Sequence, residues 1–276
     1  MKNPNKIKEG SRIADVIFYI LAIFFGFIAL YPMWYVFVLS LSEPQAAVAG
    51  NAYWWPNGFY LGGYETAVMD KNLWISYRNT IMYCITNCGL MLLTTSTCAY
   101  PLTSHALKGR KYLTFFLLIP MYFSGGMIPL FLLITQLGLY DTPWALILPG
   151  ATSIWYIILM RSFFRSIGES LREAAMIDGA NSVQRFFYVT IPLLKNTITL
   201  IVLNSLIGSF KVFDLVWIMT QGGPYHSTEV MSTYLYNQAF FMNNVGKGAA
   251  SAMMLTVIIA ICSAVYFKAS ERGEGK

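Results

Sequence analysis

Residues 16–40 read VIFYILAIFFGFIALYPMWYVFVLS, a run of 25 residues that contains no charged side chain. The hydrocarbon core of a bilayer is about 30 Å thick and is crossed by about 20 apolar residues of α-helix. This run exceeds that length. It is also too long for the apolar centre of a cleavable signal peptide, and no small-residue cleavage site follows it. We therefore predict a transmembrane helix that is retained in the mature protein.

The rest of the chain has the same apolar character. Of the 276 residues, 56% are hydrophobic and only 12% are charged, and the mean hydropathy is +0.53. These values lie outside the range of soluble globular domains. The sequence therefore predicts an all-α, polytopic membrane protein with a single domain over residues 1–276 and six transmembrane helices. The predicted crossings cover residues 16–40, 80–103, 112–137, 143–164, 194–219 and 249–267.

The positions of the lysines and arginines predict the orientation in the membrane. They gather before the first predicted helix, between the second and third, between the fourth and fifth, and after the sixth, whereas the alternate loops contain only Lys71, Arg78 and Lys247. Since cytoplasmic loops retain Lys and Arg, both termini and the loop over about residues 165–193 are expected in the cytoplasm. This distribution accounts for the net charge of +6, so we predict no nucleic-acid site.

The sequence offers few residues suited to catalysis or metal binding. All four cysteines lie within apolar segments, where we interpret them as small packing residues. The two histidines, His105 and His226, fall on opposite sides of the membrane in the predicted topology. The chain has no Gly-x-x-x-x-Gly-Lys-Ser/Thr loop to hold the phosphates of a nucleotide. We therefore predict no catalytic residue, no metal site and no cofactor in this chain.

The loop between the fourth and fifth predicted helices is unusually structured. Residues 169–194 read ESLREAAMIDGANSVQRFFYVTIPLL. Good helix formers reach Asp178, and Gly179 suits the left-handed position that ends a helix. Asn181 can cap a second short helix, which Pro192 would stop. The sequence predicts a helix, a turn and a helix, and one interpretation is an amphipathic helix pair on the inner leaflet.

A second interpretation of this loop rests on a resemblance. The pattern Glu173-Ala174-Ala175, followed by Gly179 and by Ile191-Pro192, resembles the EAA loop of ABC importer permeases. In that family the loop forms a coupling helix, which docks into a groove of a cytoplasmic ATPase subunit. The resemblance implies that six residues couple this chain to an ATPase. They are Glu173, Ala174, Ala175, Asp178, Gly179 and Pro192.

Other segments extend the resemblance over nearly the whole chain. Residues 124–129 (SGGMIP), residues 137–149 (LGLYDTPWALILP) and residues 221–224 (QGGP) with Thr228 are similar to the carbohydrate-uptake branch of these permeases. The branch includes the smaller subunit of maltose-permease-like pairs and the permeases of complex polysaccharide importers. The resemblance implies the type I ABC importer permease fold, with six transmembrane helices and a cytoplasmic coupling helix, in a bacterial cytoplasmic membrane.

The same resemblance implies a set of partners. We expect a heterodimer with a second permease subunit, two copies of an ABC ATPase that binds ATP and Mg, an extracytoplasmic solute-binding protein, a saccharide substrate and surrounding membrane lipid. Two alternatives remain open. One is a permease for a non-sugar solute such as a peptide, and the other is a non-transporting membrane scaffold subunit. The coupling loop disfavours the scaffold, because a scaffold has no need of it.

The fifth predicted helix contains candidates for the substrate path. Lys211 and Asp214 are three residues apart, which would place them on one helix face. Charged groups inside membrane helices pair with each other or face a polar cavity. These two residues are therefore expected either to neutralise each other or to contact substrate. Phe210, Phe213 and Trp217 are candidate stacking surfaces for sugar rings.

The third predicted helix contains four residues that interrupt helical hydrogen bonding, namely Pro120, Gly125, Gly126 and Pro129. Irregular backbone at membrane depth is tolerated where neighbouring protein or a cavity satisfies the freed polar groups. We predict a kink that serves packing, with a gate or hinge as the alternative.

Overall fold

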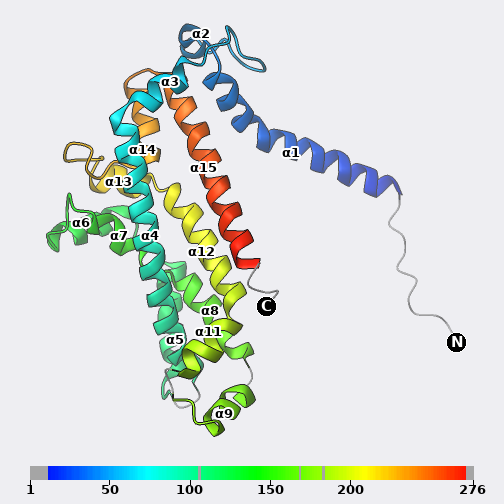
Figure 1. Cartoon of the computed structure of the whole chain (residues 1–276), viewed down its shortest axis with the longest axis vertical. Helices are drawn as coiled ribbons and strands as arrows, with labels where there is room; N and C mark the ends of the chain where they lie inside the picture. The colour runs from blue at the N-terminus through cyan, green and yellow to red at the C-terminus, as the bar shows by residue number, and fades with distance from the viewer. Residues whose placement is uncertain (1–11, 105–106, 168, 182–183, 272–276) are drawn as a thin grey trace. The chain divides into compact units, whose positions relative to one another are not determined.

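The computed structural model describes residues 12–104, 107–167, 169–181 and 184–271. Helices dominate these residues, and the only β feature among them is an isolated bridge between Ser42 and Phe59. Figure 1 shows the succession of helices. The prediction of an all-α chain is confirmed. The described residues form two compact units.

The first unit combines the described residues up to 67 with residues 238–253. The side chains of its first helix are almost all exposed between residues 16 and 30. Only the end of this helix is covered, where Val38 and Leu39 pack against Ala47, Ala52 and Ala249. The unit consists of α1 (Arg12–Ser40), α2 (Pro44–Val48), most of α3 (Gly62–Met69), most of η3 (Asn237–Phe241) and the start of α15 (Val245–Glu271).

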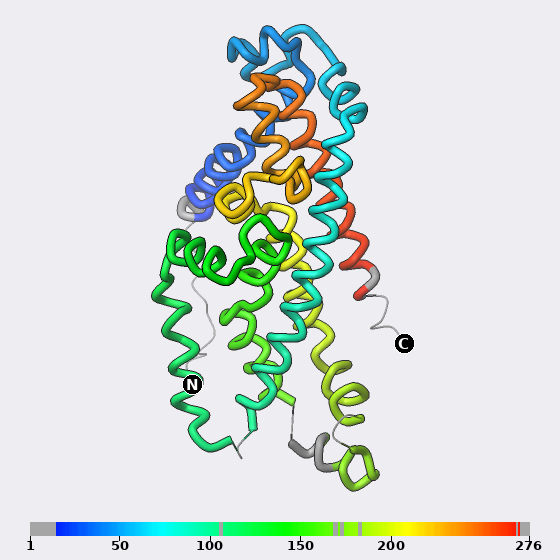
Figure 2. Tube along the Cα trace, turned by 90° about the vertical axis from the view of Figure 1, so that its left-hand side faces the viewer, coloured from blue at the N-terminus to red at the C-terminus, as the bar shows by residue number. Residues whose placement is uncertain are grey.

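The second unit covers residues 68–237 and the described residues from 254 onward. Helix α4 (Lys71–Ala99) is its central element and packs along α8 (Ile154–Ser166) and α12 (Lys195–Phe210). Figure 2 shows these helices side by side. Met91, Met160 and Ile201 form part of the core between them. The other elements are η1 (Pro101–Thr103), α5 (Arg110–Tyr122), α6 (Met127–Gln136), α7 (Trp144–Gly150), α9 (Glu169–Ile177), η2 (Arg185–Thr190), α11 (Ile191–Leu193), α13 (Asp214–Met219) and α14 (Met231–Tyr236).

The lengths of the apolar helices suit a multi-pass membrane protein. Three helical stretches are long and apolar enough to cross a bilayer by themselves: Asp15–Ser40, Lys71–Thr103 and Val245–Lys268. Three further spans are bent pairs, α5 with α6, α7 with α8, and Arg185–Leu193 with α12. The described residues therefore provide up to six crossings if each bent pair counts as one.

Helix α4 begins at Lys71, well before the start predicted at residue 80. Asp70 caps it, because its carboxylate accepts a hydrogen bond of 2.9 Å from the backbone N–H of Asn72. The predicted start was wrong because the apolar run begins only near Thr80. The first turns of α4 are polar for a different reason: Ser76 and Asn79 are buried against a later loop of the chain.

The third predicted helix is broken, and a simple kink does not describe it. Helix α5 ends at Tyr122, α6 begins at Met127, and the two axes differ by 110°. Figure 2 shows the chain turning sharply between them. Gly126 has φ +85° and ψ 176°, a conformation that is essentially restricted to glycine. The segment that contains Gly125 and Gly126 therefore separates α5 from α6, and the two helices run in different directions.

The break makes a specific prediction about two adjacent glycines. Gly126→Ala is expected to destabilise the protein by about 1–3 kcal/mol, because alanine must adopt a strained backbone conformation there. Gly125→Ala is the matched control, since Gly125 has a negative φ and an added β-carbon would meet nothing closer than Pro129 Cβ at 4.0 Å. Thermal unfolding of the solubilised protein would measure both. Equal melting temperatures for the two variants would contradict the strain argument.

The fifth predicted helix is also interrupted. Helix α12 ends at Phe210 and α13 begins at Asp214, so the continuous helix predicted over this region is wrong. At its other end, α12 is bent by 71° from the preceding helical segment, with Leu194 at the junction. The break at residues 211–213 changes the relation between Lys211 and Asp214, which do not lie on one helix face.

Candidate functional site

The first half of the predicted coupling loop is a well-terminated helix. Gly179 has φ +82° and follows the end of α9. Its N–H donates to the carbonyl of Met176 at 3.1 Å, and the N–H of Ala180 donates to the carbonyl of Ala175 at 2.9 Å. These two bonds form a Schellman motif, which satisfies carbonyl groups at a helix end. The predicted left-handed turn at Gly179 is confirmed.

The second half of the loop begins with a reciprocal capping box. The side-chain oxygen of Asn181 accepts from the backbone N–H of Gln184 at 2.8 Å, and the side-chain oxygen of Gln184 accepts from the N–H of Asn181 at 2.9 Å. The predicted cap at Asn181 is confirmed. The helical run continues as a π-helix through η2 and ends at Leu193, one residue after Pro192, close to the predicted stop.

The outer surface of this loop is apolar. Ile177 is 87% exposed, and Leu171 and Met176 on the same helix are also exposed. Phe187 and Tyr188 add exposed aromatic rings from η2. Five large exposed hydrophobic side chains in one short helical hairpin, residues 169–193, are typical of a surface that contacts another protein or the membrane.

The six predicted coupling residues all fall in this hairpin. Ala174 and Asp178 are exposed, Ala175 is half-buried, and Gly179 has open space where a β-carbon would be. The backbone of Glu173 belongs to α9, but its side chain lies outside the described residues. The small residues therefore leave the helix backbone accessible at the end of the hairpin.

The predicted path residues lie at the break in the fifth helix but do not form one group. Phe210 is buried and packs in a cluster with Leu73 and Tyr234. Lys211 and Asp214 are both exposed, and neither forms an ion pair with a described residue. Phe213 and Trp217 stack on each other with ring centres 5.6 Å apart and adjoin Tyr236. The role of these five residues in transport stays a prediction.

A cavity beside α12, with a largely apolar wall that also contains polar side chains, has no counterpart in the sequence analysis. Its volume is about 310 Å³, and α4, α8 and α12 each contribute polar side chains to its wall. The signal that could have pointed to it is the presence of amides and hydroxyls in predicted transmembrane helices. The main polar lining residues are Tyr83, Asn87, Tyr156, Asn204, Ser205 and Ser209.

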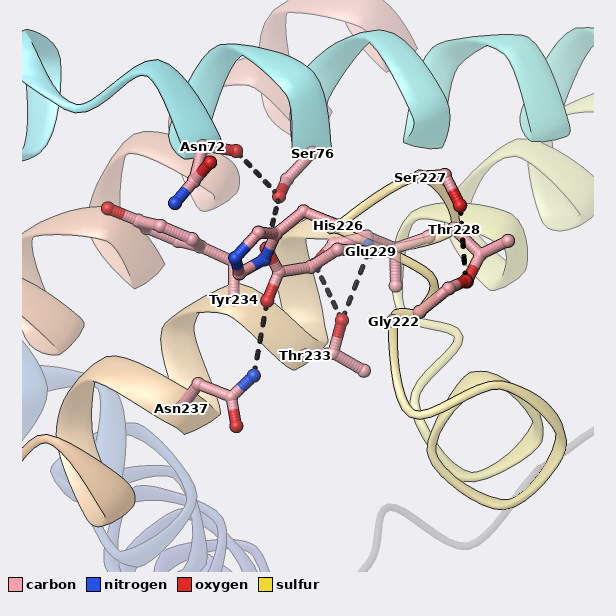
Figure 3. Close-up of polar contacts among 12 residues, drawn as sticks. Asn72, Ser76, Gly222, His226, Ser227, Thr228, Glu229, Thr233, Tyr234 and Asn237 are labelled. Atoms are coloured by element: carbon pink, nitrogen blue, oxygen red, sulfur yellow. Dashed lines mark hydrogen bonds and ion pairs between the residues drawn. The ribbon is translucent and has the colours of Figure 1, made fainter. Parts of the chain in front are cut away.

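The loop between α13 and α14 is held by a buried carboxylate that the sequence analysis also missed. Glu229 is only 2% exposed. Its Oε2 contacts His226 Nδ1 at 2.7 Å and accepts from Ser76 Oγ at 3.5 Å, and its Oε1 accepts from Asn237 Nδ2 at 3.1 Å. Figure 3 shows these partners converging on Glu229 from α4, the loop and the first residue of η3. The carboxylate therefore joins three parts of the second unit.

The amide of Asn79 holds the same loop through its backbone. Asn79 Nδ2 donates to the carbonyl oxygens of Ser227 at 2.9 Å, Glu229 at 3.0 Å and His226 at 3.3 Å. Nearby, the Tyr234 hydroxyl donates to Asp70 Oδ2 at 2.8 Å, and burial together with this bond raises the pKa of Tyr234. Asn79 thus fixes the loop to α4, and Asp70, the N-cap residue of α4, fixes Tyr234 of α14.

The Gly-Gly-Pro segment has a structural role in this loop. Gly222 has φ +82°, and an added β-carbon would lie 3.3 Å from Glu229 Cβ. The Thr228 hydroxyl bonds to Thr220 Oγ1 at 2.8 Å and to the carbonyl of Gly223 at 2.6 Å. In contrast to the buried Glu229, the side chain of Tyr225 in the same loop is 99% exposed. The segment is therefore a folded loop with a projecting tip.

Comparisons with known proteins agree with these features. The family of binding-protein-dependent transport system inner membrane components matches residues 108–270 of the chain. The chain is 30% identical over 269 residues to the polygalacturonan/rhamnogalacturonan transport system permease protein YtcP of Bacillus subtilis (strain 168), and this match covers 96% of the chain and 85% of that protein.

Solved structures give the same result. A chain from the crystal structure of a bacterial ABC transporter involved in the import of the acidic polysaccharide alginate has a TM-score of 0.80 and 29% identity, covering 94% of this chain and 97% of that one. A second chain, from a bacterial alginate ABC transporter in complex with an alginate pentasaccharide-bound periplasmic protein, has a TM-score of 0.70 at 16% identity and shares the fold, covering 95% of each chain. The protein thus belongs to the family of binding-protein-dependent transport system inner membrane components, as a multi-pass permease subunit of an ABC importer.

Proposed function

We propose that this chain forms, with a second permease, the membrane path of an ATP-driven saccharide importer. The observation that carries the proposal is the capped helical hairpin with an exposed apolar surface between α8 and α12. Two copies of an ABC ATPase bind ATP and Mg and supply the energy, and an extracytoplasmic solute-binding protein delivers the substrate. The chain lies in a bacterial cytoplasmic membrane with both termini in the cytoplasm, as the distribution of Lys and Arg favours.

The hairpin suits the transmission of movement. Its first helix ends in a Schellman motif and its second begins with a capping box, so both helix ends at the turn are fixed by hydrogen bonds. A rigid hairpin passes a displacement to the helices on either side of it, whereas a flexible loop would absorb it. ATP-driven closure of the ATPase pair can then shift the permease between two packed arrangements.

The substrate class follows from the relatives. The names of the similar permeases and of the similar solved structure refer to polygalacturonan, rhamnogalacturonan and alginate transport. Each of these is a polymer of sugar units, and this supports a saccharide over a peptide. We place the path along the fifth predicted crossing, α12 with α13, where the break leaves Lys211 and Asp214 exposed and Phe213 stacks with Trp217.

Purification of the tagged chain from its native membrane tests the proposal. Mass spectrometry of the retained proteins should find a second permease, an ABC ATPase and, after addition of saccharide, a solute-binding protein. The purified complex in proteoliposomes should hydrolyse ATP faster when the loaded binding protein is added. If only peptides stimulate ATP hydrolysis by the complex, the chain is better assigned to a peptide importer. Recovery of the chain without any ATPase would contradict the coupling role of the hairpin.

A further inference from the structure

The cavity beside α12 is lined by a residue with an unused hydrogen-bonding group. Tyr83 is 5% exposed and lines the cavity. Its hydroxyl is buried and has no hydrogen-bond partner among the residues that the structure describes. A buried hydroxyl without a partner costs free energy, so such groups are normally satisfied by protein, water or ligand. Tyr83 is therefore a residue of the cavity wall whose hydroxyl has a hydrogen bond left to form.

The remaining wall of the cavity offers further hydrogen bonds. Asn87 Nδ2 is 3.4 Å from the carbonyl of Ile147, and Asn204 Nδ2 donates to the carbonyl of Leu200 at 2.9 Å. Neither amide oxygen accepts a hydrogen bond from the described residues. Serine hydroxyls stand beside these amides on the α12 side. The wall therefore presents several hydrogen-bond donors and acceptors to a molecule in the cavity.

The lining residues of the cavity differ in exposure. Tyr83 is buried, whereas Asn204 and Gly208 lie on an exposed face of α12. An added β-carbon on Gly208 would meet nothing within 4 Å. A ligand can thus approach the cavity from the exposed face of α12.

No charged side chain lines the cavity among the described residues. This absence matters because the relatives include permeases for acidic polysaccharides. A carboxylate placed here would lose its water without gaining a cation, which is costly in a low-dielectric site. A neutral sugar unit loses only hydroxyl hydration, and the amides, the serines and Tyr83 can replace it.

We propose that the cavity lined by Tyr83, Asn87, Asn204 and Ser209 is a subsite of this chain for an uncharged sugar unit of the transported saccharide. Tyr83 donates a hydrogen bond to one hydroxyl of the sugar ring, and Asn87 and Asn204 form hydrogen bonds with other hydroxyls of the same unit. The inference rests on the proposed saccharide import and adds which chain holds the sugar, where it does so, and the charge of the unit that fits.

The first test fills the cavity. Gly208→Phe places a ring at the mouth, and Gly89→Phe is the matched control, because Gly89 is an exposed helical glycine with equal free space but outside the cavity. In proteoliposomes of the whole importer, Gly208→Phe should raise the KM for uptake of a neutral oligosaccharide by about 10-fold or more through lost binding, and Gly89→Phe should leave it unchanged. Equal behaviour of the two variants would overturn the proposal.

The second test removes the phenol hydroxyl. Tyr77 provides the control, since it is also buried on α4 with an unpartnered hydroxyl but does not line this cavity. Loss of one neutral hydrogen bond in Tyr83→Phe should raise the KM about 3- to 10-fold, while Tyr77→Phe matches wild type. Both variants should melt at similar temperatures. A KM shift of the same size in both would assign Tyr83 to packing and overturn the proposal.

The probes are cellotetraose, xylotetraose, maltotetraose and tetragalacturonate. Uptake of a neutral probe that is sensitive to Gly208→Phe and Tyr83→Phe supports the subsite. Import of tetragalacturonate alone overturns the preference for an uncharged unit. Wild-type uptake of a neutral probe with no effect of either variant overturns the subsite but leaves saccharide import standing. If no saccharide stimulates ATP hydrolysis by the complex, the proposed function itself is contradicted.

Discussion

Gly179→Arg is expected to abolish saccharide uptake while leaving the permease in the membrane. The residue at position 179 has φ +82°, and a left-handed backbone costs a residue with a β-carbon about 1–2 kcal/mol. The substitution therefore weakens the Schellman motif that ends α9. It also adds a long cationic side chain in the open space at the end of the hairpin, where the ATPase is proposed to dock.

The measurement compares two activities of the reconstituted importer. Uptake driven by ATP should fall at least about 10-fold in Gly179→Arg, which corresponds to about 1.4 kcal/mol of lost coupling. ATP hydrolysis should continue without stimulation by the loaded binding protein. Gly179→Asn is the matched control, because asparagine tolerates the left-handed region, and it should retain most of the uptake. Normal stimulated uptake by the arginine variant would rule out the proposed docking at this turn.

Local signals in the sequence were sufficient for the coupling hairpin. Gly179 and Asn181 specify a helix end and a helix start through bonds to residues within five positions. Such short-range chemistry can be read from the order of residues alone. The apolar length of the first and last predicted helices was equally informative, because a bilayer sets a minimum length for each crossing.

Interruptions of helices were harder to predict than helices themselves. The fifth predicted helix ends and restarts at residues 211–213. Apolar residues lie on both sides of this break, so the sequence predicts Lys211 and Asp214 as charges within one continuous helix. In the third predicted helix, proline and glycine indicated irregular backbone, but the 110° turn depends on where α6 packs. Ile134 of α6, for example, is buried in a cluster with Ala145 and Val216. Contacts of this kind are tertiary, and periodicity does not reveal them.

The polar sites depended on contacts between distant residues. Asn79 and Glu229 are 150 positions apart, and each looks unremarkable in its own segment. The cavity likewise combines Tyr83 from α4 with Asn204 from α12. The charged and aromatic residues at the break indicated the fifth predicted helix as a source of path residues, whereas the amide and hydroxyls of α12 that line the cavity were not predicted.

Glu229→Ala is expected to destabilise the second unit by about 3 kcal/mol or more, because hydrogen bonds to charged groups contribute about 1.5–3 kcal/mol each. The substitution removes the acceptor shared by His226, Ser76 and Asn237. It also leaves a void beside Gly222, whose backbone packs against this side chain. The loop that projects Tyr225 should then open far more often than in the wild type.

Thermal melting and proteolysis, each compared with a control variant, distinguish this loss of stability from the effect of removing one negative charge. Glu65→Ala removes the same charge from an exposed site and should leave the melting temperature unchanged. Chymotrypsin should cleave the loop next to Tyr225 at least about 10-fold faster in Glu229→Ala, as expected if opening becomes easier by ~1.4 kcal/mol or more. Glu229→Gln keeps the shape and an oxygen for Asn237, so its loss should be smaller. If Glu229→Ala melts and is cleaved like Glu65→Ala, the buried carboxylate does not hold the loop.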